Sequence, residues 1–181
     1  YEEVVQSFMT ADTASTKQDY SDYSVICWWL KMRSGLLYLA DIELGKYETP
    51  ELKLMVEEFW KKHTKLDLRY PMLLPTALYM EAKPYGHFLN RQLTSHANVR
   101  LLPVPKDKSS GDKIARFLNV VPYYAQGRIL VPAEHKHKAH VMREILSMTG
   151  EGSGTGHDDV VDNFSDATVV AFSSPGMDYS N

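Results

Sequence analysis

The sequence has few of the features that mark secreted, disulfide-bonded or membrane-spanning proteins. It contains one cysteine, Cys27, which excludes an internal disulfide framework. Its apolar runs, such as residues 25–30, are far shorter than the roughly 20 residues needed to cross a bilayer. The N-terminus also lacks the basic and apolar regions of a signal peptide. We therefore expect a protein of a reducing cytoplasm that is not secreted.

An excess of positive charge is also lacking, because the formal net charge is −3 at pH 7. This excludes a global attraction to nucleic acid, so any DNA binding needs a local basic face. No P-loop occurs. The Gly-rich stretch 150–156 lacks the Lys-Ser/Thr pair that such a loop needs and runs into two aspartates. We expect this stretch to be a flexible loop.

The composition that remains is that of an ordinary globular protein, with 44% hydrophobic and 24% charged residues. A chain of 181 residues has the length of one domain. We therefore predict a single domain over residues 1–172, followed by a frayed tail over residues 173–181.

The pattern of apolar residues predicts an α/β fold. Three early strands joined by turns, at 7–11, 24–31 and 36–44, form an antiparallel meander. A helix over 49–63 follows, with Thr49 as its N-cap and Pro50 at the first helical position. Strands at 76–81, 99–104 and 128–131 then alternate with helices at 84–96, 110–121, 138–148 and 158–172. This order predicts a mixed sheet, completed by crossover strands and flanked by helices on both faces.

Acidic residues stand at the ends of several of these elements. Asp12 ends the first strand, Glu81 ends the fourth, and Asp158 and Asp159 begin the last helix. If the first and fourth strands are neighbours, Asp12 and Glu81 lie close together, and the helix can add a third carboxylate. Crowded carboxylates repel one another unless a divalent ion neutralises them, and their oxygens suit Mg²⁺ or Mn²⁺. Each acid alone also fits an ordinary turn, strand edge or helix cap.

Basic residues form a second group of candidates. The stretch 135–140 is rich in histidine and lysine, but its spacing matches no usual zinc pattern, so we predict a basic, solvated helix start. Residues that could together contact DNA phosphates are Lys106, Lys108, Lys113, Arg116, Lys136 and Lys138. Scattered solubilising charge is the alternative interpretation of these residues.

Several of these stretches, in order, resemble the nuclease domain of the large terminase subunit of tailed bacteriophages. They are Ala11-Asp12-Thr13-Ala14-Ser15 and the segments 19–25, 37–42, 45–52, 79–86 and 157–162. One position departs from that pattern, because Pro84 stands where the family usually has a small residue after the lysine. The likeness spans nearly the whole chain.

The resemblance implies an RNase H-like nuclease that cuts concatemeric double-stranded viral DNA in the host cytoplasm with two Mg²⁺ or Mn²⁺ ions. By position, Asp12, Glu81 and Asp158 would hold the metals, with Asp159 as a rival to Asp158. Asp162, one helical turn further on, is a weaker candidate.

The same resemblance implies partners and a missing neighbour. A portal protein and a small terminase subunit would be the partners in the intact motor. The ATPase domain that precedes the nuclease domain in the family is absent from this chain, so we expect a piece of a longer polypeptide. Two alternatives stay open: a docking module for those partners with a weak or regulated site, and another RNase H-like nuclease such as a resolvase.

Overall fold

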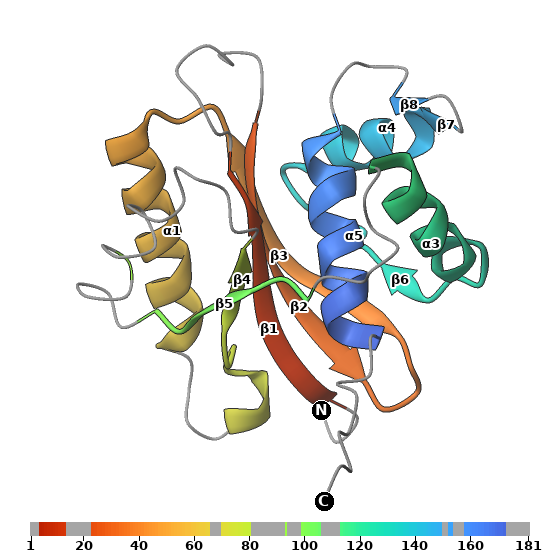
Figure 1. The fold of residues 1–181 in the computed structure, drawn as a ribbon. Helices are drawn as coiled ribbons and strands as arrows, with labels where there is room; N and C mark the ends of the chain where they lie inside the picture. Colours follow the sequence, from red (N-terminus) through yellow and green to blue (C-terminus); the bar gives the residue numbers. More distant parts are fainter. Residues whose placement is uncertain are drawn as a thin grey trace, which may run out of the picture.

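The computed structural model is built around a mixed sheet of six strands, in the order β5-β4-β1-β2-β3-β6 (Figure 1). It describes residues 4–13, 23–65, 70–80, 93, 99–105, 113–149, 152–153 and 158–172. Helix α1 covers one face of the sheet, and α5 covers the other with α3 and α4 beside it (Figure 1). The predicted α/β architecture is confirmed.

The centre of the sheet is the predicted antiparallel meander. It consists of β1 (Val4–Asp12), β2 (Ser24–Met32) and β3 (Leu37–Gly45). Strands β1 and β2 are longer than predicted, whereas β3 has its predicted length and is shifted by one residue. Gly35, in the turn between β2 and β3, has a φ of 86°, which a side chain disfavours. A Cβ atom there would also come within 2.9 Å of the Arg128 side chain. Gly35 therefore allows the tight turn that sets the β2–β3 register.

Three short strands extend the meander on both sides. They are β4 (Leu78–Met80), parallel to β1; β5 (Leu101–Pro103), parallel to β4; and β6 (Ile129–Leu130), parallel to β3. Each is shorter than predicted, because β-propensity continues past the residues that pair. The predicted helix over 84–96 lies outside the described residues, except for Leu93, which is helical and fully buried.

The described α-helices are α1 (Thr49–Thr64), α3 (Lys113–Ala125), α4 (Lys138–Ser147) and α5 (Asp159–Phe172); η1 (Pro71–Leu73) is a short 3-10 helix. The prediction of Thr49 as N-cap was wrong by one residue. Glu48 is the N-cap, and its backbone N–H donates to the Glu51 carboxylate (3.3 Å) in a capping box.

Helix α3 continues past its predicted end at residue 121, although Pro122 lies inside it. Packing explains this, because the Tyr123 ring stacks on Phe172 of α5 at 4.6 Å between centroids. The loop prediction for residues 150–156 was wrong in part. Gly152–Ser153 forms β8, which pairs antiparallel with β7 (Met148–Thr149), and α4 accordingly ends at Ser147. The predicted tail lies outside the described residues.

Two hydrophobic clusters fill the space between the sheet and its helices. The cluster on the α5 side contains Trp29 and Phe164, whose rings meet edge to face at 4.7 Å. The cluster on the α1 side includes Val56, which is fully buried. Each such side chain contributes about 1.5–3 kcal/mol through burial. Among the residues described, no helix has the length and apolar character to span a membrane.

A β-bulge in β3 changes which of its side chains face each of these clusters. The register shifts where Trp28 pairs with Asp41 and Trp29 pairs with Leu39, so Ala40 is the extra residue. Side chains on the α5 side are therefore odd-numbered before the bulge and even-numbered after it. As a result, Asp41 faces the α1 side of the sheet.

Candidate functional site

Asp12 is the last residue of β1, and only 9% of its surface is exposed. Side chains along a strand alternate between its two faces. Phe8 belongs to the cluster on the α5 side, and Thr10 Oγ1 donates to Asn163 Oδ1 of α5 (2.6 Å). Asp12 therefore lies on the α5 side too. Its register partner on β2 is Val25.

The start of α5 lies at the same end of the sheet. Asp158 immediately precedes the helix, and Asp159 is its first residue. The Asp159 carboxylate accepts a hydrogen bond from the Tyr23 backbone N–H (3.0 Å). Tyr23 lies just before β2, two residues from the partner of Asp12. The structure thus brings Asp12 and the start of α5 together around the first residues of β2.

The end of β4 lies beside the end of β1. Met80 is the register partner of Ala11 in a parallel pairing, so the expected neighbourhood of the first and fourth strands is confirmed. Glu81 follows Met80 in the sequence but lies outside the described residues. Its role as a third carboxylate therefore stays a prediction.

Asp162 faces a cation from α3. An Arg116 guanidinium nitrogen lies 4.0 Å from Asp162 Oδ1, and another lies 3.9 Å from Asp166 Oδ1. Arg116, predicted as a contact for DNA phosphates, is thus engaged with two acids of α5. This makes Asp162 a weaker metal candidate than Asp158 or Asp159.

A buried chain of hydrogen bonds fastens α5 to β1 and β2. Trp29 Nε1 donates to Thr10 Oγ1 (2.8 Å), Thr10 donates to Asn163, and Asn163 Nδ2 donates to the Val25 carbonyl (3.2 Å). Thr10, Trp29 and Asn163 have no exposed surface. These hydrogen bonds were not predicted from the sequence. Their signal was an amide within the otherwise largely apolar stretch 160–164, which a buried helix tolerates only when the amide has partners.

The N-terminus of α5 is capped by a side chain from α4. Glu144 Oε1 accepts the backbone N–H groups of Val160 (2.6 Å) and Val161 (3.1 Å), and Glu144 is only 2% exposed. His140, one turn earlier on α4, places Nε2 3.3 Å from the other carboxylate oxygen. A carboxylate here satisfies helical N–H groups and complements the helix dipole. Nothing in the local sequence pattern predicted this long-range cap.

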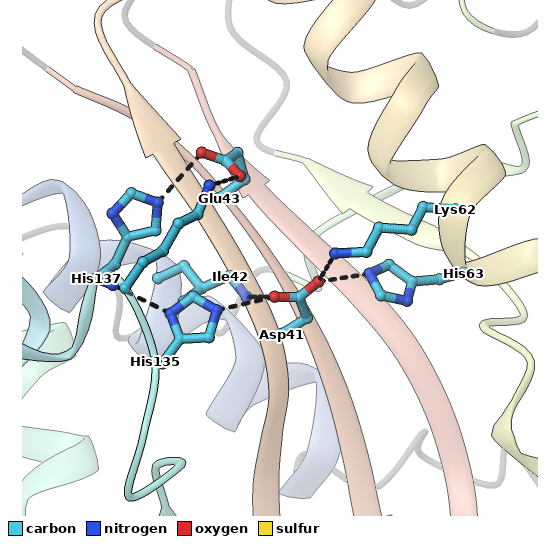
Figure 2. A network of polar contacts seen from close by, with 8 residues as sticks. Asp41, Ile42, Glu43, Lys62, His63, His135 and His137 are labelled. Atoms are coloured by element: carbon cyan, nitrogen blue, oxygen red, sulfur yellow. Dashed lines mark hydrogen bonds and ion pairs between the residues drawn. The ribbon is translucent and has the colours of Figure 1, made fainter.

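A second group of polar residues lies at the β3 edge of the sheet (Figure 2). Asp41 Oδ2 contacts His63 Nε2 (2.8 Å) and Lys62 Nζ (2.7 Å) of α1, and Oδ1 contacts His135 Nε2 (3.0 Å) from the segment before α4. Burial by itself would raise the pKa of the Asp41 carboxyl, but these three hydrogen bonds outweigh it and hold the pKa well below its usual range.

Glu43, two residues further along β3, completes this group (Figure 2). Its carboxylate contacts Lys136 Nζ (2.6 Å) and His137 Nε2 (3.2 Å). Burial alone would raise the pKa of the Glu43 carboxyl, but the two hydrogen bonds have the larger effect. The pKa of Glu43 is therefore lowered. The pKa of His137 is lowered, chiefly by burial, despite the Glu43 carboxylate. We call Asp41, Glu43, Lys62, His63, His135, Lys136 and His137 the β3-edge network.

The predicted basic start of α4 is correct for Lys136 and Lys138, which are exposed, whereas His135 and His137 are partly buried. The predicted DNA-binding residues that the structure describes are spread over separate places. Arg116 faces α5, Lys136 pairs with β3, and Lys138 Nζ donates to the Ala133 carbonyl. Lys113 is the first residue of α3, whereas positions 106 and 108 lie outside the described residues. Their role in binding DNA stays a prediction.

The donor types at the end of β1 suit a divalent ion, because carboxylate oxygens are the ligands that Mg²⁺ and Mn²⁺ prefer. The described part offers Asp12 from the sheet, Asp158 from just before α5 and Asp159 as the first residue of that helix. Within that part, no group of three or more His, Cys, Asp or Glu side chains is arranged to hold a metal. A complete ligand set would therefore need Glu81 or a movement of these side chains.

A mixed six-stranded sheet with an antiparallel meander, parallel flanking strands and helices on both faces is an RNase H-like fold. The sequence model of the terminase RNaseH-like domain family matches residues 9–171. The chain therefore belongs to that family. A search of curated protein sequences gave no significant match.

Solved structures of viral terminase nuclease domains share this fold. The P22 large terminase nuclease domain is 13% identical with a TM-score of 0.63, and the match covers 91% of this chain and 80% of that one. The human cytomegalovirus terminase nuclease domain is 12% identical with a TM-score of 0.61, over 91% of this chain and 82% of that one. A manganese-soaked structure of the cytomegalovirus domain matches with a TM-score of 0.58 at 12% identity, over 93% and 83%. The expected relationship to terminase nuclease domains is confirmed.

Proposed function

We propose that this domain is a divalent-metal-dependent endonuclease that cuts double-stranded DNA. The observation that carries the proposal is the meeting of two carboxylate-bearing elements at the start of β2. Asp12 lies opposite Val25, and Asp159 is bonded to Tyr23. The terminase RNaseH-like family and the fold shared with two viral terminase nuclease domains support the same activity.

The proposed metal ligands are Asp12, Glu81 and either Asp158 or Asp159. The manganese soak of the cytomegalovirus domain supports Mn²⁺ as a usable ion. When bound, two divalent ions would supply the charge that activates a water and stabilises the leaving oxygen of a phosphodiester. Asp159 is a better candidate ligand than Asp162. The Tyr23 N–H orients the Asp159 carboxylate toward β2, whereas Asp162 faces Arg116.

The surrounding protein holds the Asp12 carboxylate in place before any ion arrives. Asp12 is fixed by the paired end of β1 and is almost fully buried, which limits the rotamers that it can adopt. Burial also strengthens every charge interaction of this carboxylate, because nearby water that would screen it is scarce. In the intact motor the substrate would be concatemeric viral DNA, with the portal protein and small terminase subunit as partners.

The test is cleavage of supercoiled plasmid with Mn²⁺. We expect the wild-type protein to nick and linearise the plasmid, and Asp12→Asn to be slower by about 100-fold or more, because an amide is a poor metal ligand. Asp41→Asn is the matched control, since it makes the same change in a carboxylate of the β3-edge network, and it should cut normally below its melting temperature.

Two results would contradict the proposal: cleavage that needs no divalent ion, and an Asp12→Asn variant as fast as the wild type. A strong preference for branched over linear DNA would instead favour a resolvase-like activity. Binding to a portal protein without any cleavage would favour a docking module.

A further inference from the structure

We propose that Thr10 and Asn163 are positioning residues, which set the place of the α5 carboxylates relative to Asp12 and thereby the affinity for the metal. This inference rests on the proposed function. Thr10 precedes Asp12 by two residues on the same face of β1, and Asn163 follows Asp159 by one helical turn. The hydrogen bond between Thr10 and Asn163 therefore lies directly beneath the candidate site, one step further along both β1 and α5.

The donors and acceptors of this chain admit one arrangement. The Val25 carbonyl can only accept, so the Asn163 amide faces it with the nitrogen Nδ2. The amide oxygen Oδ1 is then left to face Thr10, whose hydroxyl donates its proton to Oδ1 and accepts the Trp29 indole N–H. The carbonyl of the strand that lies opposite Asp12 and the indole, which can only donate, thus fix the direction of every bond between them.

These directional hydrogen bonds fix the position of α5 along β1 and its rotation about its own axis, whereas apolar contacts alone would allow the helix to slide. A shift of α5 along β1 would break the Thr10–Asn163 bond (2.6 Å) and leave buried polar groups without partners. The same shift would move Asp158 and Asp159 relative to Asp12. Partners that orient metal ligands typically change metal affinity by about 10–100-fold.

The experiment compares two Thr→Val substitutions of nearly equal size and burial. Thr10→Val removes the hydroxyl that links β1 to α5. Thr168→Val removes a hydroxyl on α5 that donates to the Phe164 carbonyl of the same helix (2.8 Å), and Thr168 is 4% exposed. Mn²⁺ binding is measured by calorimetry, and plasmid cleavage is measured as a function of Mn²⁺ concentration, both well below the melting temperatures.

We expect Thr10→Val to raise the Mn²⁺ dissociation constant by about 10-fold or more, with a parallel rise in the Mn²⁺ needed for half-maximal cleavage. Thr168→Val should lower the melting temperature and leave both metal readouts unchanged. Thr10→Ser, which keeps the hydroxyl, should bind Mn²⁺ like the wild type. If Thr10→Val is unfolded under these conditions, Thr10→Cys takes its place, because a thiol is a weaker donor and should change both readouts in the same direction.

The inference is overturned if Thr10→Val, or Thr10→Cys in its place, binds Mn²⁺ like the wild type. It is also overturned if Thr168→Val weakens binding as much as Thr10→Val does. These outcomes leave the proposed function standing, since the wild type still binds and cleaves. A wild-type protein that binds no Mn²⁺ would overturn both.

Discussion

The carboxylates at the start of α5 and those of the β3-edge network are supported in different ways. Asp41 and Glu43 are surrounded by the lysines and histidines of two other segments, α1 and the residues before α4, so the protein itself supplies the opposite charge. Asp159 is oriented by a backbone N–H from Tyr23, and Asp12 ends a strand at 9% exposure. The comparison sets acids that fasten the layers together beside the acids that we propose as metal ligands.

Asp41→Asn should give the largest effect on stability. Asp41 is bonded to α1 and to the segment before α4, so the loss of its charge weakens three charge-assisted contacts at once. We expect the free energy of unfolding in urea at neutral pH to fall by about 2–3 kcal/mol. Glu58→Gln, an exposed change on α1, is the control and should stay within about 0.5 kcal/mol of the wild type. If Asp12→Asn destabilised the fold as much as Asp41→Asn, the distinction between the two groups would not hold.

Glu144→Gln should give an intermediate effect. The glutamine oxygen can still accept the Val160 and Val161 N–H groups, but the negative charge at the start of α5 is lost. We expect a loss of about 1 kcal/mol in urea unfolding. Glu134→Gln, an exposed change in the loop before α4, serves as the matched control. A Glu144→Gln protein as stable as the control would show that this carboxylate adds nothing as a cap.

His137→Gln should give the smallest effect, visible only as a change in pH dependence. The folded state lowers the pKa of His137, so it binds this proton less readily than the unfolded chain does. That contribution to stability is present above the unfolded pKa, near 6.5, and is lost as the pH falls through the lower folded value. The stability advantage of wild type over His137→Gln should therefore shrink from about pH 7.5 to about 5.5. An advantage that grows on acidification would contradict the sign of this shift.

Much of the fold follows from local sequence. The meander, α1 and α5 were predictable because their apolar residues recur at periods of two and 3.6 over long stretches. The short strands β4, β5 and β6 were predicted in the right places but too long. Where a strand ends is decided by its pairing with a neighbouring strand, which the local sequence does not show. The hairpin of β7 and β8 was missed, because the Gly-rich composition of residues 150–156 indicates a loop whether or not part of it pairs.

The part of the candidate site that depends on the order of strands and helices along the chain was predictable. Asp12 and Asp159 stand at element ends, and the prediction that strands one and four are neighbours is confirmed by the Met80–Ala11 pairing. The contacts that hold these elements together could not be predicted. Glu144 reaches the N–H groups of α5 across 16 residues of sequence, and Thr10 reaches Asn163 across 153. Such pairs depend on packing, which local periodicity does not encode.

The long separation of β1 and α5 along the sequence also determines when the candidate site can form during synthesis. Asp12 is synthesised well before its neighbours on α5, which lie near residue 159. Contacts so distant in sequence form late and slowly, because the long intervening loop must close first. A ribosome must therefore release most of the domain before the carboxylates can meet, and a nascent chain that stops before α5 should be inert toward DNA.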